Sequence, residues 1–191
     1  MSKGRMEAFS DGVIAILITI MVLELKIPRS AELSALRPLA PEFVSYALSF
    51  LFLGIYWNNH HHLLQAIKHV NARVLWANLH LLFWLSLTPF VTGWVGENEF
   101  AAWPVALYGV VFLLSGVAYF ILTHSLISLH GRDSVLGEAV GNDFKGKISI
   151  VLYVIAIPLS FFVPRAAFVL YALTAGMWLI PNRRIEKALG E

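Results

Sequence analysis

The chain has 191 residues, of which 58% are hydrophobic and only 14% are charged, and its mean hydropathy is +0.71. Soluble domains carry roughly 25% charged residues, so this composition predicts an integral membrane protein. The 14 Lys and Arg nearly balance the 12 Asp and Glu. A nucleic-acid surface needs a clustered basic face, so nucleic acid is not an expected partner. The chain contains no cysteine, which excludes disulfides, thiolate metal sites and cysteine nucleophiles.

Six apolar runs follow one another along the chain. A helix needs about 20 residues to cross roughly 30 Å of hydrocarbon. The runs therefore predict an all-α integral membrane protein in which residues 1–191 form a single domain with six transmembrane helices. The last two runs are short, and only a tight turn fits between them, so a re-entrant hairpin is the alternative for that pair. The predicted helices are 9–25, 43–64, 74–95, 104–127, 148–163 and 166–180.

The positively charged residues indicate how these helices are oriented. With six spans, ten basic residues fall on the side that holds both termini and four on the other side. Cytoplasmic loops carry the excess of Lys and Arg, so both termini are expected in the cytoplasm. The ten are Lys3, Arg5, Lys68, Arg73, Arg132, Lys145, Lys147, Arg183, Arg184 and Lys187, and the four are Lys26, Arg29, Arg37 and Arg165.

Polar residues gather at the cytoplasmic ends of the first three predicted helices. Polar side chains in a membrane usually face the interior of the bundle, so one polar belt is expected there. A simpler interpretation applies to Ser10 and Asp11, because both residue types favour the first turn of any helix. The belt consists of Arg5, Ser10, Asp11, Trp57, Asn59, His62, Asn78 and His80.

The stretch RMEAFSDGVIAI resembles the Arg-x-x-x-Phe-Ser-Asp signature that opens the first helix of the transmembrane-protein-175 potassium channels. The six-run layout and the NLHLLFW stretch of the third helix agree with this resemblance. It implies a potassium channel of the bacterial plasma membrane, a homotetramer whose single pore is lined by the first helix of each subunit. It further implies that Arg5, Phe9, Ser10 and Asp11 hold this helix against its neighbours. Asn78, His80 and the tryptophans are then expected as their partners.

The first helix also carries an apolar stripe. Ile16, Thr19, Ile20 and Leu23 are spaced i, i+3, i+4 and i+7, so they share one helical face. Asp11 lies about 140° from Ile16 around the helix and cannot belong to that face. The polar residues are therefore expected to anchor the back of the helix while the stripe faces the pore axis. An ordinary lipid-facing or packing face is the alternative for this stripe.

An apolar stripe repeated by several subunits can form a selective gate. Rings of isoleucine and leucine exclude bulk water, and an ion must shed part of its hydration to pass them. Potassium holds water less tightly than sodium, so such a constriction favours potassium. The chain has no Thr-Val-Gly-Tyr-Gly loop that could form a carbonyl filter. Thr19 is the only hydroxyl on the stripe and is expected to help coordinate ions.

Other chemistries are less well supported by the sequence. The consecutive histidines of NNHHHL point about 100° apart on a helix, so they do not form a metal site. His62 and His80 lie at similar depth, which leaves a haem-binding membrane oxidoreductase as one alternative. A proton-coupled carrier that uses Asp11 is another. No nucleophile, general base pair or phosphate loop is found, so no enzyme activity and no cofactor besides the permeant potassium ion are expected.

Overall fold

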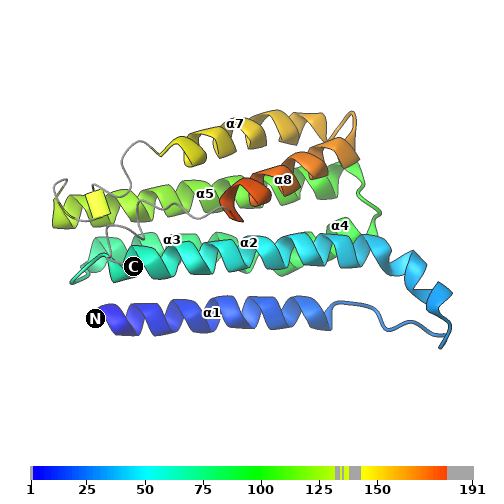
Figure 1. The fold of residues 1–191 in the computed structure, drawn as a ribbon, viewed down its shortest axis with the longest axis horizontal. Coiled ribbons are helices and arrows are strands. Elements are labelled where there is room, and N and C mark those ends of the chain that lie inside the picture. Colours follow the sequence, from blue (N-terminus) through cyan, green and yellow to red (C-terminus); the bar gives the residue numbers. More distant parts are fainter. Residues whose placement is uncertain (1, 132–133, 135, 138–142, 180–191) are drawn as a thin grey trace.

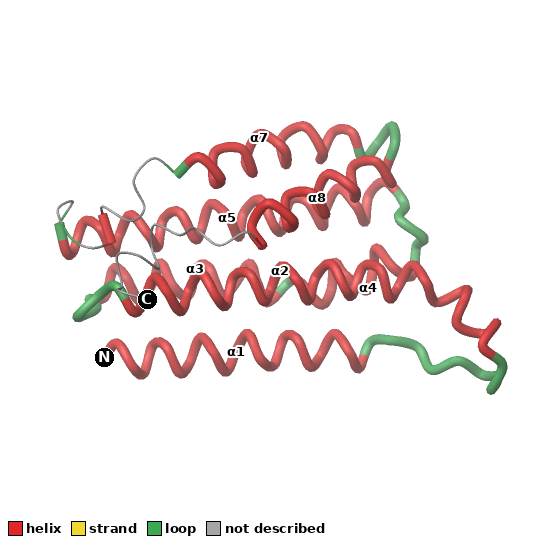
Figure 2. Tube along the Cα trace, viewed as in Figure 1, coloured by secondary structure: helices red, strands yellow, loops and turns green. Residues whose placement is uncertain are grey.

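The computed structural model of the 191-residue chain describes residues 2–131, 134, 136–137 and 143–179. The regular structure of these residues is helical, as Figure 2 shows. The prediction of an all-helical membrane protein is confirmed. If the consecutive helices α3 and α4 are counted as one broken helix, the described α-helices form six columns.

The first half of the chain forms a long helix, a looped connection and a second long helix. Helix α1 is Lys3–Leu23, the short 3-10 helix η1 is Leu33–Leu39, and α2 is Ala40–Gln65. Helix α1 begins six residues before the predicted start at Phe9. Its first turns carry Lys3, Arg5 and Glu7, which are absent from the apolar run that guided the prediction.

The predicted helix 74–95 is two helices, α3 (Ala72–Ser86) and α4 (Thr88–Glu97). Asn71 caps the start of α3, because its side chain accepts a hydrogen bond from the backbone N–H of Val74 at 3.0 Å. Pro89 causes the break at Leu87, since proline has no N–H to donate to the preceding turn.

Among its described residues, the second half contains one very long helix, α5, and two shorter ones, α7 and α8. Helix α5 is Ala102–His130, α7 is Phe144–Leu159 and α8 is Pro164–Leu179. Helix α5 ends at Gly131, whose positive φ of 92° suits glycine. Helices α7 and α8 have 16 residues each, and α7 ends four residues before the predicted boundary at Val163.

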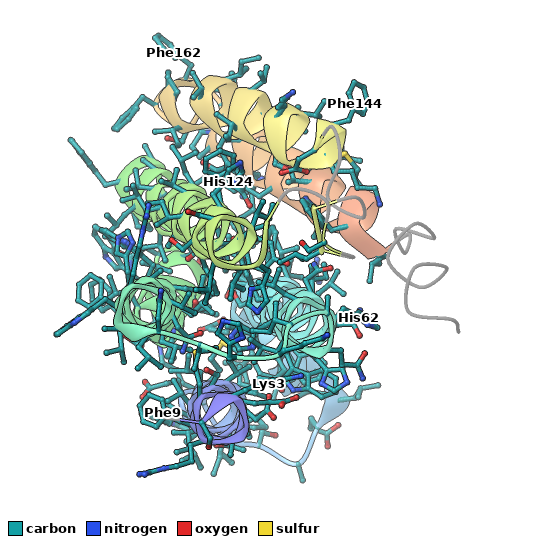
Figure 3. The ribbon with its side chains drawn as sticks, turned by 90° about the vertical axis from the view of Figure 1, so that its left-hand side faces the viewer. Lys3, Phe9, His62, His124, Phe144 and Phe162 are labelled. Atoms are coloured by element: carbon teal, nitrogen blue, oxygen red, sulfur yellow. The ribbon has the colours of Figure 1, made fainter. Side chains whose placement is uncertain are left out.

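The helices run side by side, with α1 at one edge of the bundle (Figure 1). Seen along the bundle in Figure 3, α7 and α8 lie at the opposite edge from α1. The buried apolar residues form two clusters. One joins α1 to α2, α3 and α5, and the other joins α7 and α8 to α2, α4 and α5. Helices α2 and α5 take part in both clusters and so hold the two edges together.

Within the described part of the chain, four helical segments are long and apolar enough to cross a membrane. They are Lys3–Leu23, Leu33–Gln65, Ala72–Glu97 and Ala102–His130. Helices α7 and α8 are shorter than the roughly 20 residues that a perpendicular span needs. Six complete spans therefore stay a prediction, as does the re-entrant alternative for the last pair.

Candidate functional site on the first helix

Helix α1 has one buried face and one exposed face. The exposed stripe consists of Ile16, Thr19, Ile20 and Leu23, which the rest of the described residues leave exposed. The exposed fraction is 57% for Ile16 and 81% for Leu23, against 2% for Ile14 on the other side. The four residues predicted to line a pore thus share a face that is directed away from their own subunit. The buried face consists of Met6, Ser10, Ile14, Leu17 and Met21.

A chain of buried hydrogen bonds fixes the first turns of α1, at the end that is predicted to lie in the cytoplasm. His60 Nε2 and Asn78 Oδ1 are 2.7 Å apart. The Asn78 amide then donates to Ser10 Oγ at 2.9 Å, and the Ser10 hydroxyl donates to the carbonyl of Met6 at 2.9 Å. All three side chains are buried, so each bond is shielded from competing water. This network ties α1 to both α2 and α3.

Two further contacts join α1 to α2 beside this network. The Trp57 indole N–H donates to Asp11 Oδ1 at 3.0 Å. His61 Nδ1 lies 3.3 Å from Glu7 Oε1, and His61 Nε2 lies 2.9 Å from the Gln65 amide nitrogen. Because an amide nitrogen can only donate, His61 Nε2 accepts, and its Nδ1–H is free to donate to Glu7. Asp11 therefore lies away from the exposed stripe and is held by α2.

The signature residues separate into two pairs. Ser10 and Asp11 contact neighbouring helices, whereas Arg5 and Phe9 are exposed and lie within about 20° of Ile16 around α1. Within the described residues, Arg5 has no hydrogen bond or ion pair. In Figure 3, Phe9 lies on the outer side of α1, whereas Lys3 is directed toward the bundle. There the Lys3 ammonium donates to the carbonyl of Ile67 at 3.1 Å.

The remaining residues of the predicted belt lie elsewhere. Asn59 and His62 line a cavity that contains no residue of α1. His80 is exposed on α3, where its Nε2 accepts a hydrogen bond from Trp84 at 2.9 Å. His62 and His80 therefore do not converge as the haem alternative requires. Among the described residues, no group of three His, Cys, Asp or Glu side chains could hold a metal ion.

The three consecutive histidines of α2 serve three different neighbours. His60 bonds Asn78, His61 faces Glu7, and His62 lines the cavity. The sequence indicated that these side chains diverge, yet it did not single out His60 as the residue linked to Ser10. The bond from Lys3 of α1 to the carbonyl of Ile67 was also missed, although a cation is favourable near the C-terminus of a helix such as α2.

The fold and these contacts define a multi-pass helical membrane protein whose first helix leaves one apolar face uncovered within the subunit. Comparisons with known proteins identify the family. The sequence model of the endosomal/lysosomal potassium channel TMEM175 matches residues 5–89. A potassium channel of Chryseobacterium sp. (strain P1-3) is 55% identical over 191 residues, which is 100% of both chains.

More distant relatives carry the same family name. The crystal structure of a lysosomal potassium-selective channel TMEM175 homolog from Chamaesiphon minutus superposes with a TM-score of 0.80 at 26% identity, and the match covers 94% of this chain and 97% of that one. The endosomal/lysosomal proton channel TMEM175 of Homo sapiens is 35% identical over 96 residues, which is 44% of this chain and 19% of the human protein. The chain belongs to the TMEM175 family. It is therefore a member of an ion-channel family and not an enzyme.

Proposed function

We propose that the chain forms a homotetrameric, potassium-selective channel of a bacterial plasma membrane, with one pore lined by α1. The Chryseobacterium relative is named a potassium channel and the Chamaesiphon relative a potassium-selective channel homolog, which supports the choice of ion. The observation that carries the proposal is the exposed stripe, because an apolar face on a helix otherwise packed against its own subunit is available to line a shared axis.

Small residues beside the stripe support an oligomer. Gly4, Ala8 and Gly12 are spaced four residues apart and lie on the exposed side of α1. Such spacing lets transmembrane helices approach closely. A Cβ added at Gly4 or Gly12 would meet nothing within 4 Å in the subunit, so packing within the subunit does not require glycine there. A neighbouring copy of the chain would use this room.

The stripe would act as a hydrophobic constriction. Four copies of Ile16, Ile20 and Leu23 would form successive apolar rings, and an ion would lose part of its hydration in crossing them. The Thr19 hydroxyl donates to the carbonyl of Ile16 at 2.9 Å, so its oxygen lone pairs stay available to a cation. This arrangement would favour potassium over sodium without a carbonyl filter.

The proposed topology has six spans with both termini in the cytoplasm. In Figure 1, the start of α1, the connection from α2 to α3 and the start of α3 lie at the bundle end that holds the N-terminus. These segments carry Lys3, Arg5, Lys68 and Arg73, and together with the ten-to-four division of basic residues they support the proposed topology. Reporter tags fused at Met1 and at Glu191 should both be found in the cytoplasm. Tags on opposite sides of the membrane would contradict the proposal.

The gate is tested with Ile16→Asn in reconstituted bilayers. A wetter and wider neck should raise the current and increase the sodium-to-potassium permeability ratio, because the dehydration barrier that separates the two ions is reduced. The measurement is the reversal potential with potassium on one side and sodium on the other. We expect the same trend, less strongly, for Ile16→Ala.

The matched control is Val22→Asn. Val22 is exposed on α1, yet it lies about 120° from Ile16 and thus off the stripe. Its substitution should leave the permeability ratio near that of the unmodified channel. If Val22→Asn alters the ratio and Ile16→Asn does not, the pore-lining face has been misassigned. If the unmodified protein carries no potassium current at any voltage, the channel proposal itself fails.

A further inference from the structure

A cavity of about 160 Å³ lies on the side of the bundle away from α1. Residues of α2, α5, α7 and α8 line it, together with Leu136 and Asp143 from the connection between α5 and α7, and none comes from α1. An engineered protein cavity of about 150 Å³ accommodates a benzene molecule. The space is therefore large enough for one aromatic ring, and it is separate from the proposed pore face.

The walls of the cavity are mainly aromatic and aliphatic, and several polar side chains complete the lining. Phe52, Tyr56 and Tyr153 represent the apolar walls. Among the polar lining residues, His62 and Thr123 each have a buried atom, Nδ1 and Oγ1, with no hydrogen-bond partner among the described residues. Buried polar atoms are normally satisfied, and leaving one without a partner costs about 1 to 3 kcal/mol.

We propose that this cavity binds a small uncharged amphiphile, consisting of one aromatic ring and one hydroxyl group. The ring would occupy the apolar part. The hydroxyl is both donor and acceptor, so it could satisfy His62 Nδ1 and Thr123 Oγ1. A charged ligand would lose its hydration in a mostly apolar space that also contains both Asp143 and Lys147 at its lining, so no net field of one sign favours it.

The chain itself offers a substitution that fills the cavity. Gly116 lies on α5 at the cavity wall, and a Cβ added there would meet only Tyr56 Oη, at 3.8 Å. Gly116→Leu should therefore occupy the space without a clash of its first atom. Gly93→Leu on α4 is the matched control, because a Cβ there meets nothing within 4 Å and Gly93 does not line the cavity.

The test uses the full-length protein in detergent, with benzyl alcohol as the probe and toluene as the ring without a hydroxyl. Ligand that binds only the folded state raises the melting temperature with concentration. We expect benzyl alcohol to raise it more than toluene in the unmodified protein and in Gly93→Leu, and neither compound to raise it in Gly116→Leu. Thr123→Val should reduce the benzyl alcohol shift toward that of toluene.

Labelling provides a second measurement that does not depend on the leucine variant folding. The natural chain has no cysteine, so Gly116→Cys introduces a single thiol at the cavity and Gly93→Cys a single thiol elsewhere. Benzyl alcohol at about ten times its Kd should slow the reaction of a small thiol reagent roughly tenfold at Gly116→Cys only.

Two results would overturn the proposal. Equal shifts in the unmodified protein and Gly116→Leu, with no protection of Gly116→Cys, would mean that the alcohol acts through the detergent. No shift and no protection in the unmodified background would mean that the cavity holds only water. Neither result depends on whether the protein conducts potassium.

Discussion

The buried face and the exposed stripe of α1 are made of similar residues, yet different surroundings hold them. Ile14 and Leu17 pack into the cluster shared with α2, α3 and α5, and Ser10 on the same face is hydrogen-bonded. Ile16 and Leu23, by contrast, are largely exposed. Hydrophobicity alone therefore does not separate the two faces of this helix. The difference comes from the hydrogen bonds among His60, Asn78 and Ser10, here called the polar anchor, which fix the rotation of α1 about its axis.

This difference assigns separate consequences to the two faces. Changes on the buried face should alter the stability of the subunit, because they remove contacts within it. Changes on the exposed stripe should alter ion permeation, because within the subunit they remove almost nothing. A reversal of either consequence would undermine the proposed pore.

The largest effect is expected from shortening the buried face. Ile14→Ala removes a fully packed side chain and leaves a cavity, which costs about 2 to 5 kcal/mol in protein cores. Ile16→Ala removes an exposed side chain and should change the free energy of unfolding of the subunit much less. Denaturant titration of both variants in detergent measures this. Equal losses would show that Ile16 is as tightly packed as Ile14 in the assembly.

A smaller loss of stability is expected from replacing Asn78, the central residue of the polar anchor. Asn78→Leu removes the acceptor for His60 and the donor to Ser10, leaving buried polar atoms unsatisfied. The expected cost is about 1 to 3 kcal/mol of unfolding free energy. His80→Leu is the control, because His80 is exposed and bonds only Trp84 on its own helix. A greater loss for His80→Leu than for Asn78→Leu would contradict the role given to the buried network.

The sequence predicted the class of fold well, because membrane helices must be apolar over a fixed length. It predicted the division of α1 into two faces for a similar reason, since helical periodicity follows from residue spacing alone. The break at Leu87 was missed: one helix was predicted over 74–95, whereas the structure ends α3 at Ser86 and begins α4 at Thr88. Helix ends were also misplaced where charged turns such as Lys3–Glu7 extend beyond the apolar run.

The partners of the anchor were harder to predict. Spacing shows that His60, His61 and His62 diverge, but which one faces α1 depends on how α2 is rotated in the bundle. Packing against α4, α1 and α8 sets that rotation, and no local pattern encodes it. His62 was therefore expected near Ser10 and Asp11, whereas it lies at the cavity, and His60 was overlooked.

Replacing Asp11, at the edge of the buried face, should cause an intermediate loss of stability. Its carboxylate accepts from the Trp57 indole and is only partly buried, so Asp11→Ala should cost about 0.5 to 1.5 kcal/mol. Asp11→Asn keeps an acceptor and should cost less. The permeability ratio of both variants should stay near that of the unmodified channel. A sharply altered ratio with normal stability would place Asp11 at the pore and the anchor elsewhere.

The smallest effects are expected from two cations at the start of α1. Lys3 lies on the packed side and donates to the carbonyl of Ile67 just beyond the end of α2. Arg5 lies on the side of the stripe and has no such bond to any residue that the structure describes. Lys3→Gln should therefore cost about 0.3 to 1 kcal/mol of unfolding free energy, the usual value of a cation near a helix C-terminus. Arg5→Gln should leave the stability of the isolated subunit unchanged.

Conductance should show the opposite order for the same pair. If α1 lines the pore, four Arg5 side chains stand near its entrance and repel incoming potassium, so Arg5→Gln should raise the current from that side. The gain should shrink as ionic strength rises, because salt screens exposed charges beyond about 10 Å at 0.1 M. Lys3→Gln should show no such salt-dependent gain, since its ammonium is turned toward α2. If Lys3→Gln gives the salt-dependent gain and Arg5→Gln does not, α1 is rotated in the assembly and the exposed stripe faces lipid.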